Sequence, residues 1–219
     1  INEKKKIINL HIRDQIKNIK ENLFIIMAGG FGKRLKPYTN KIPKPLLRVK
    51  KKEIIKYTLD QAIKNNFSNF LITTFYKKNL IKKYLKKNFK IPFLFTEEKK
   101  PLGTAGSLSL ISKPKIDFIV CNGDIITNID FEEVLNFHQK NNAEATIVLK
   151  KIRTKNPYGE VNIDGLKINE IYEKKITEQF AIAGIYVFSP KVLRYLKENE
   201  KIDMISFLNR LKLKKKKII

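Results

Sequence analysis

The sequence predicts an α/β protein with a mixed, mainly parallel sheet flanked by helices. Short apolar runs such as 23–28 and 117–121 have the length of strands buried on both faces. Segments with helical spacing of apolar residues, such as 53–66 and 79–88, alternate with these runs. Such alternation is typical of a parallel sheet whose strands are connected by crossover helices.

The remaining elements follow from the same patterns. Further strands are expected at 69–74, 92–96, 144–151 and 180–188, and further helices at 104–111, 131–141 and 204–213. Runs 161–163 and 167–172 are joined at Asp164-Gly165, a hairpin signal, which predicts a small antiparallel second lobe. We expect His138 to face solvent on its helix.

The net charge of +25 raises the question of a nucleic-acid-binding protein. Of the 46 basic residues 40 are lysines, spread along the whole chain, and arginine, the better reader of phosphates and bases, is scarce. This distribution favours a solvated lysine surface that attracts anionic substrates. We therefore expect no nucleic-acid partner, and keep that class as an alternative.

Cysteine content and hydropathy bear on the compartment. Cys121 is the single cysteine, which excludes an internal disulfide and fits a reducing, cytoplasmic setting. No apolar run approaches the ~18 residues that span a membrane. We expect a cytoplasmic protein without a membrane partner.

A glycine-rich turn follows the first apolar run. Gly29, Gly30 and Gly32 remove the side chains from one short turn, so that a ligand can approach the backbone closely. Successive N–H groups in such a turn form an anion-binding nest. The cations Lys33 and Arg34 come next, and the combination predicts a phosphate-binding site.

Two familiar phosphate-binding motifs are excluded. In the P-loop pattern, Met27 would stand in place of the first glycine and Arg34 in place of the hydroxyl residue. In the dinucleotide pattern, Leu35 would stand in place of the last glycine. A third cation, Lys44, lies between two prolines that stiffen its backbone.

The pattern G-G-x-G-x-R-L-x-P-x-T, followed by P-K-P, resembles the signature of the sugar-phosphate nucleotidyltransferases. The resemblance implies a Rossmann-like fold, with a small sugar-side lobe, and transfer of a nucleoside monophosphate to a sugar 1-phosphate. It implies that Arg34 and Lys44 are catalytic. It also implies that the turn binds the nucleotide, through Ala28, Gly29, Gly30, Gly32 and Lys33.

The run PLGTAG at 101–106 begins an expected helix. From the residues alone it is an anion or polar-ligand site, because a helix N-terminus presents N–H groups. In the resembled family this run lies against the base and ribose, which implies nucleotide-binding roles for Gly103 and Thr104.

The run NGD at 122–124 follows a buried strand. Ligands of open parallel sheets bind beyond the carboxyl ends of the strands, where a carboxylate can hold a hard cation. The resemblance implies that Asp124 is catalytic and binds Mg²⁺.

The acceptor side is assigned by resemblance. Tyr158, Gly159, Glu173 and Lys174 match elements that contact the sugar and its phosphate in the family. Read without the resemblance, the last two belong to an exposed charge run.

The resemblance also divides the chain. Residues 1–22 resemble the tail of a CBS module or a linker, and 23–219 form the nucleotidyltransferase domain. We expect this domain to be C-terminally incomplete, because the family's second metal-binding aspartate, in a W-x-D-I-G-like context, is absent.

The branch most resembled uses hexose or hexosamine 1-phosphates, as in mannose-1-phosphate and glucosamine-1-phosphate guanylyltransferases with upstream CBS modules. We expect GTP, a sugar 1-phosphate and Mg²⁺ as ligands, and a homo-oligomer is compatible. The alternatives are a UTP- or dTTP-using transferase, a catalytically silent sugar-nucleotide-binding regulatory protein, and a basic nucleic-acid-binding protein.

Overall fold

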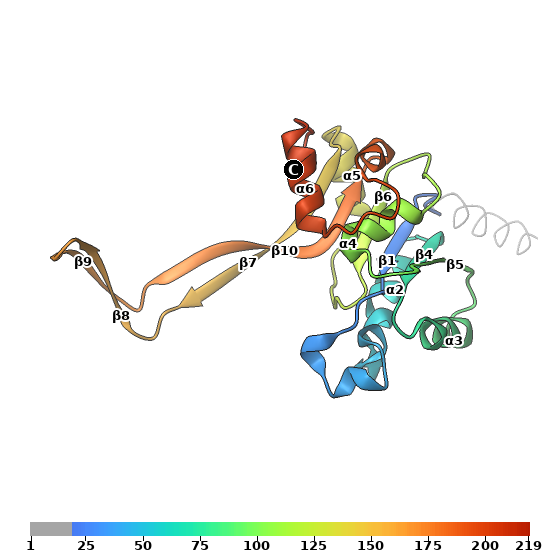
Figure 1. Cartoon of the computed structure of the whole chain (residues 1–219), viewed down its shortest axis with the longest axis horizontal. Helices are drawn as coiled ribbons and strands as arrows, with labels where there is room; N and C mark the ends of the chain where they lie inside the picture. The colour runs from blue at the N-terminus through green and yellow to red at the C-terminus, as the bar shows by residue number, and fades with distance from the viewer. Residues whose placement is uncertain (1–18) are drawn as a thin grey trace, which may run out of the picture.

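The computed structural model describes residues 19–219 (Figure 1). Its centre is a six-stranded sheet of order β5-β4-β1-β6-β10-β7. The strands are β1 (Phe24–Met27), β4 (Phe70–Thr74), β5 (Phe93–Glu97), β6 (Phe118–Asn122), β7 (Ala145–Lys155) and β10 (Ile176–Phe188). β1 pairs in parallel with β4 and β6, and β4 with β5, whereas β10 is antiparallel to both of its neighbours. The predicted mixed, mainly parallel sheet is confirmed.

Helices cover both faces of this sheet. On one face, α2 (Ile54–Lys64), α3 (Lys78–Asn88) and α5 (Phe131–Lys140) pack against a core that includes Phe24 and Ile26 of β1. On the other, α4 (Gly103–Gly106), the 3₁₀ turns η4 (Ser107–Leu110) and η5 (Pro190–Tyr195), and α6 (Met204–Leu213) pack against Ile25. The apolar run of β1 is therefore buried on both sides, as a central strand requires.

Short elements fill the segment between β1 and α2. They are the 3₁₀ turns η1 (Lys33–Leu35), η2 (Tyr38–Asn40) and η3 (Lys44–Leu46), and the small hairpin of β2 (Arg48–Val49) and β3 (Lys52–Glu53). This segment follows the carboxyl end of β1.

The strand order creates a switch point between β1 and β6. From β1 the chain moves outward to β4 and β5, then returns to place β6 on the opposite side of β1. In open α/β sheets the crevice beyond the carboxyl ends at such a point is where ligands bind.

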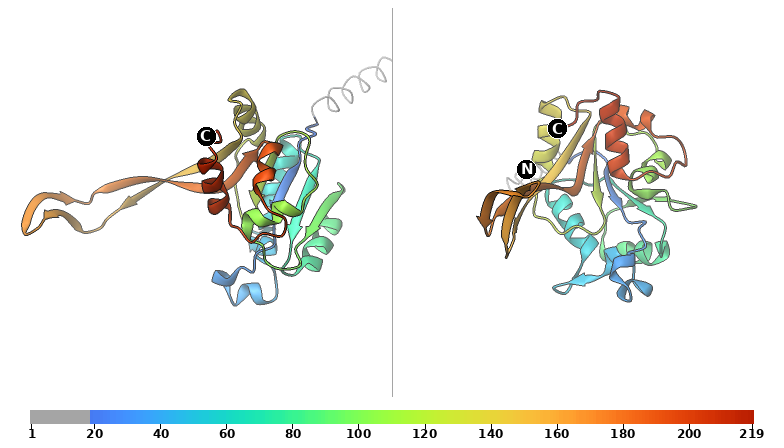
Figure 2. Two further views of the ribbon diagram at one scale, coloured as in Figure 1. Left: turned by 45° about the horizontal axis from the view of Figure 1, so that its top comes forward. Right: turned by 60° about the vertical axis from the view of Figure 1, so that its left-hand side comes forward.

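The antiparallel lobe takes the form of a projecting arm. The outer parts of β7 and β10 leave the sheet as a two-stranded ribbon, which ends in the hairpin of β8 (Gly159–Asp164) and β9 (Lys167–Glu173). Figures 1 and 2 show this arm standing clear of the body. Where β10 leaves the sheet, its register shifts between Ile182 and Tyr186 and Gly184 adopts φ +80°.

Two local expectations are wrong. The helix expected at 104–111 is a four-residue α-turn followed by a 3₁₀ turn, and a backbone in the β region at Ile111 ends it. His138 does not face solvent: it is buried, and its Nδ1 lies 2.7 Å from the Thr146 hydroxyl. Helical spacing alone could not show that the His138 face of α5 is buried, because that burial results from packing beside β7.

The expected CBS-like tail, residues 1–22, lies almost wholly outside the described residues and stays a prediction. Within residues 19–219, no helix is both long and apolar enough to cross a membrane.

We expect His138 to make stability depend on pH. Burial lowers the pKa of its imidazole, although Asp117, 3.8 Å from Nε2, acts in the opposite direction. The unfolded chain therefore takes up this proton first, and the free energy of unfolding should fall as pH drops below about 6.5, by at most about 1.4 kcal/mol per pH unit.

Urea unfolding between about pH 7.5 and pH 5.5 measures this dependence. His138→Gln, which retains a polar group for Thr146 but does not titrate, should show a flatter profile. Identical profiles for the two proteins would contradict the assignment.

Candidate active site

An open pocket of about 460 Å³ lies at the carboxyl ends of β1 and β6, within the size range of small-molecule sites. All ten residues predicted to be catalytic or nucleotide-binding contribute to its lining. They are Ala28, Gly29, Gly30, Gly32, Lys33, Arg34, Lys44, Gly103, Thr104 and Asp124. Four separate segments of the chain thus converge on one cavity.

The glycine turn forms one wall, and two of its positions tolerate no side chain. A methyl group on Gly29 would lie 2.6 Å from Oε1 of Glu98, and one on Gly32 would lie 2.7 Å from Cγ2 of Thr39. Gly32 also has φ +63°, a conformation that glycine adopts without steric cost. Gly30 differs, because a methyl group there meets no atom within 4 Å.

Aromatic contacts anchor this turn. The Phe31 ring packs edge-on against Phe75, with centroids 5.5 Å apart, and lies 5.4 Å from the Tyr76 ring. The Tyr76 hydroxyl donates a hydrogen bond of 3.0 Å to the Thr39 carbonyl. These contacts hold the loop against the end of β4, so that Arg34, exposed on η1, is placed at the pocket.

Lys44 and Asp124 form an ion pair within the pocket, from Nζ to Oδ2. Both side chains are about one-third exposed. Lys44 comes from η3 and Asp124 from the turn after β6, so the pair connects the two sides of the switch point.

The turn that carries Asp124 is held directly against β1. The Gly123 amide donates to the Met27 carbonyl at 2.9 Å, and a methyl group on Gly123 would lie 2.8 Å from that oxygen. Within residues 19–219, no group of three or more acidic, histidine or cysteine side chains gathers for a metal. A single carboxylate nevertheless suits Mg²⁺, which is usually held by one or two carboxylates with substrate phosphates and water.

The opposite wall is α4, and its N-terminus differs from the expected anion site. The amides of Ala105 and Gly106 donate to the Ile202 carbonyl, at 3.2 and 3.0 Å, instead of pointing at a ligand. The Thr104 hydroxyl accepts a hydrogen bond of 2.8 Å from the Met204 amide. Gly103, at φ +80°, approaches the same Ile202 carbonyl, to which a methyl group would come within 2.6 Å.

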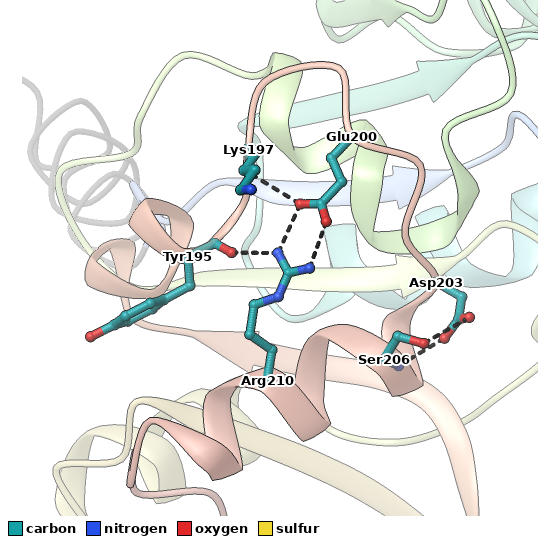
Figure 3. Close-up of polar contacts among 6 residues, drawn as sticks. All are labelled: Tyr195, Lys197, Glu200, Asp203, Ser206 and Arg210. Atoms are coloured by element: carbon teal, nitrogen blue, oxygen red, sulfur yellow. Dashed lines mark hydrogen bonds and ion pairs between the residues drawn. The ribbon is translucent and has the colours of Figure 1, made fainter.

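The loop that supplies Ile202 is secured by the polar cluster in Figure 3. The Arg210 guanidinium donates to both carboxylate oxygens of Glu200, at 2.7 and 2.5 Å, and to the Tyr195 carbonyl at 2.9 Å. Asp203 accepts from the Ser206 amide at 2.8 Å and caps α6. The Arg210 hydrogen bonds also lower the pKa of Glu200 to about 2, which keeps the pair charged at neutral pH.

Glu98 is a pocket residue that the sequence analysis missed. Its Oε2 accepts from the Leu102 amide at 2.8 Å, and Oε1 lies against the glycine turn. Burial raises the pKa of this carboxyl, although the Leu102 hydrogen bond acts in the opposite direction. In the sequence it is hidden in the run EEKK, and its position directly after β5 was the available signal.

The four acceptor-side candidates lie elsewhere. Tyr158, Gly159, Glu173 and Lys174 are at the base of the β8–β9 hairpin on the arm, and all are exposed. None of them lines the pocket. Their predicted contacts with the sugar phosphate stay a prediction.

A two-sided α/β sheet with a glycine turn, cations and a carboxylate at its switch point defines a phosphate-ligand-binding protein. The family model described as "Nucleotidyl transferase" matches residues 23–218, and the chain belongs to this family. Its fold is shared by a solved UDP-glucose pyrophosphorylase complexed with UDP-glucose. That structure has a TM-score of 0.65 and 22% identity, and the match covers 90% of this chain and 88% of the other.

Two curated relatives are mannose-1-phosphate guanylyltransferases. The catalytic subunit beta of Danio rerio is 33% identical over 181 residues, and the enzyme of Yarrowia lipolytica is 34% identical over 180. The alignments cover 78% and 77% of this chain and 50% of each relative. The chain therefore spans about half the length of the curated relatives it matches.

We expect Gly32→Ala to destabilise the protein, because the new methyl group meets Thr39 and the positive φ is strained for alanine. A loss of about 1–3 kcal/mol in the free energy of unfolding is the usual size of such strain. Gly30→Ala is the matched control and should unfold at an unchanged denaturant concentration. Equal stability of the two variants would show that the turn readily changes shape.

Proposed function

We propose that this chain transfers the guanylyl group of GTP to a hexose or hexosamine 1-phosphate, with mannose 1-phosphate the favoured acceptor, and releases pyrophosphate. The observation that carries the proposal is the convergence of the glycine turn, Arg34, Lys44 and Asp124 on one pocket. The guanylyltransferase relatives, at 33% and 34% identity, support the choice of guanine and mannose.

The reaction exchanges one phosphorus–oxygen bond for another. A phosphate oxygen of the acceptor attacks the α-phosphorus of GTP, and the bond from that phosphorus to the bridging oxygen breaks. Pyrophosphate leaves with the bonding electron pair. The protein's part is positioning and charge stabilisation. The glycine-turn amides hold the triphosphate, and Arg34 stabilises the charge that builds on the leaving group.

The Lys44–Asp124 pair has a further role in this scheme. In this structure each charge offsets the other. With substrates bound, Lys44 would turn to the phosphates, and Asp124 would hold Mg²⁺. When bound, Mg²⁺ supplies neutralisation of the phosphate charge.

Glu98 is our candidate for reading the base. Guanine presents two adjacent donors, N1–H and the N2 amino group, whereas uracil and thymine present a single donor between two carbonyls. A carboxylate matches the guanine edge, since it only accepts hydrogen bonds. Glu98 lies between the glycine turn and the Gly103 wall, where the resemblance places the base.

The acceptor-side contacts and the cellular location stay predictions. Contacts of Tyr158, Gly159, Glu173 and Lys174 with the sugar phosphate would require the arm to approach a pocket. A cytoplasmic location is also a prediction, which cell fractionation would test. A silent regulatory protein would bind these ligands without releasing pyrophosphate, so the first assay below distinguishes it.

The first test is pyrophosphate release from GTP, mannose 1-phosphate and Mg²⁺. Arg34→Ala should lower turnover about 10²–10³-fold, the usual loss of one preorganised charge-stabilising donor. Lys36→Ala, a neighbouring exposed lysine outside the pocket lining, is the control and should be near normal. Near-normal turnover by Arg34→Ala would contradict the assigned role, and GTP binding without any turnover would favour the regulatory protein.

The second test concerns the base. Glu98→Gln replaces one acceptor with a donor, and should lower kcat/KM for GTP about 10–100-fold, the size of a lost charged hydrogen bond, with a smaller loss or a gain for UTP. Glu97→Gln is the control, because Glu97 is outside the pocket lining and pairs with Lys78 and Lys82 of α3. Equal losses for the two nucleotides would remove Glu98 from base recognition.

A further inference from the structure

The hairpin at the end of the arm has two unlike faces. Its register sets Val161 opposite Ile171 and Ile163 opposite Ile168, and the shift after Asn162 keeps all four on one face. The other face pairs Glu160 with Tyr172, Asn162 with Glu170, and Asp164 with Lys167. One face therefore carries the four aliphatic side chains, with Gly159 and Glu173 at its base, and the other face is polar.

The aliphatic face is uncovered in residues 19–219. Its four side chains are between 48% and 70% exposed, and Leu166 at the turn is fully exposed. A two-stranded hairpin is marginally stable alone in water and needs a further layer over an apolar face. A clustered, exposed aliphatic face of this kind marks an interaction surface.

The distribution of charge favours a second copy of this chain as the partner that covers the aliphatic face. Residues 156–175 carry four acidic side chains and three lysines, in a chain whose net charge is +25. The hairpin is thus close to neutral while the body is strongly basic. Two copies of this chain repel each other through their bodies, and the hairpin is where they meet with the least repulsion.

The length of the arm strengthens this argument. The ribbon between the sheet and the hairpin has seven residue pairs, from Leu149–Ile182 to Lys155–Ile176, and is about 20 Å long. Two bodies joined through their hairpins would be separated by two such ribbons. That separation is several times the screening length of about 8 Å at physiological salt.

We propose that the aliphatic faces of two hairpins, from two copies of this chain, pack against each other. Such a contact is self-complementary under a two-fold axis, since each copy contributes the same four residues. It makes a two-layered, four-stranded unit and leaves both polar faces in water. The small area predicts a reversible, concentration-dependent dimer.

Sedimentation velocity of the full chain, from low micromolar to near-millimolar protein, tests the proposal. We expect a monomer–dimer equilibrium whose dissociation constant rises at least about tenfold in Ile168→Lys, because a charge is then buried in the contact. Asn162→Lys adds the same charge on the polar face of the same hairpin and should leave the equilibrium unchanged. Ile168→Ser, which adds no charge, should also weaken the dimer.

A thiol cross-link tests the geometry. Cys121 is the single cysteine and is fully buried, so an engineered cysteine on the hairpin is the accessible thiol. Under mild oxidation, Ile163→Cys or Ile168→Cys should give covalent dimers and Asn162→Cys should not. The hairpin lies outside the core, so circular dichroism of each variant should match the parent.

Three outcomes would overturn the proposal. One is a chain that stays monomeric at the highest concentration, which would mean that the aliphatic face does not pair with a second copy. The second is a dimer equally strong in Ile168→Lys and in Asn162→Lys. The third is equal cross-linking from both faces. None of these readouts depends on the catalytic activity.

Discussion

The parallel pairing of β1 with β6 is the constraint on which the site depends. It brings the carboxyl ends of two buried strands together. The hydrogen bond from the Gly123 amide to the Met27 carbonyl then holds the turns that follow against each other. Because these turns touch backbone to backbone, a side chain on Gly123 would collide with Met27. The glycine turn on one side and the Asp124 carboxylate on the other are placed by this contact.

The pocket contains three cations and two carboxylates, and the two carboxylates differ in burial and in their partners. Lys33, Arg34 and Lys44 make it cationic, as suits a polyphosphate in a chain of net charge +25. Asp124 is one-third exposed and offset by Lys44, whereas burial raises the pKa of Glu98, which accepts a hydrogen bond from the Leu102 amide. The two carboxylates therefore lie in different electrostatic surroundings within one pocket.

The far wall depends on residues a hundred positions away. Thr104 and the amides after it are held by Met204 and Ile202, and the Arg210–Glu200 pair holds that loop in turn. Bidentate, charge-assisted hydrogen bonds of this kind fix geometry as well as adding stability. A substitution at Arg210 can therefore alter the α4 wall of the pocket from outside its lining.

Local patterns in the sequence determined the strands, most helices, and the glycine turn with its cations. Each of these depends on the spacing of apolar residues or on the backbone freedom of glycine within a few positions. The rule for parallel strand ends also predicted a ligand site at Asp124. The likeness to a known family supplied the chemical roles of the pocket residues.

Only the tertiary structure decided the rest. Glu97 and Glu98 are neighbours with the same side chain, yet one pairs with lysines of α3 and the other lines the pocket. His138 is buried because β7 packs beside α5, and the antiparallel lobe is an arm whose four acceptor-side candidates lie outside the pocket. The physical reason is common to these cases. A side chain's environment is set by segments far away in the chain, and the local spacing of residues does not predict which segments those are.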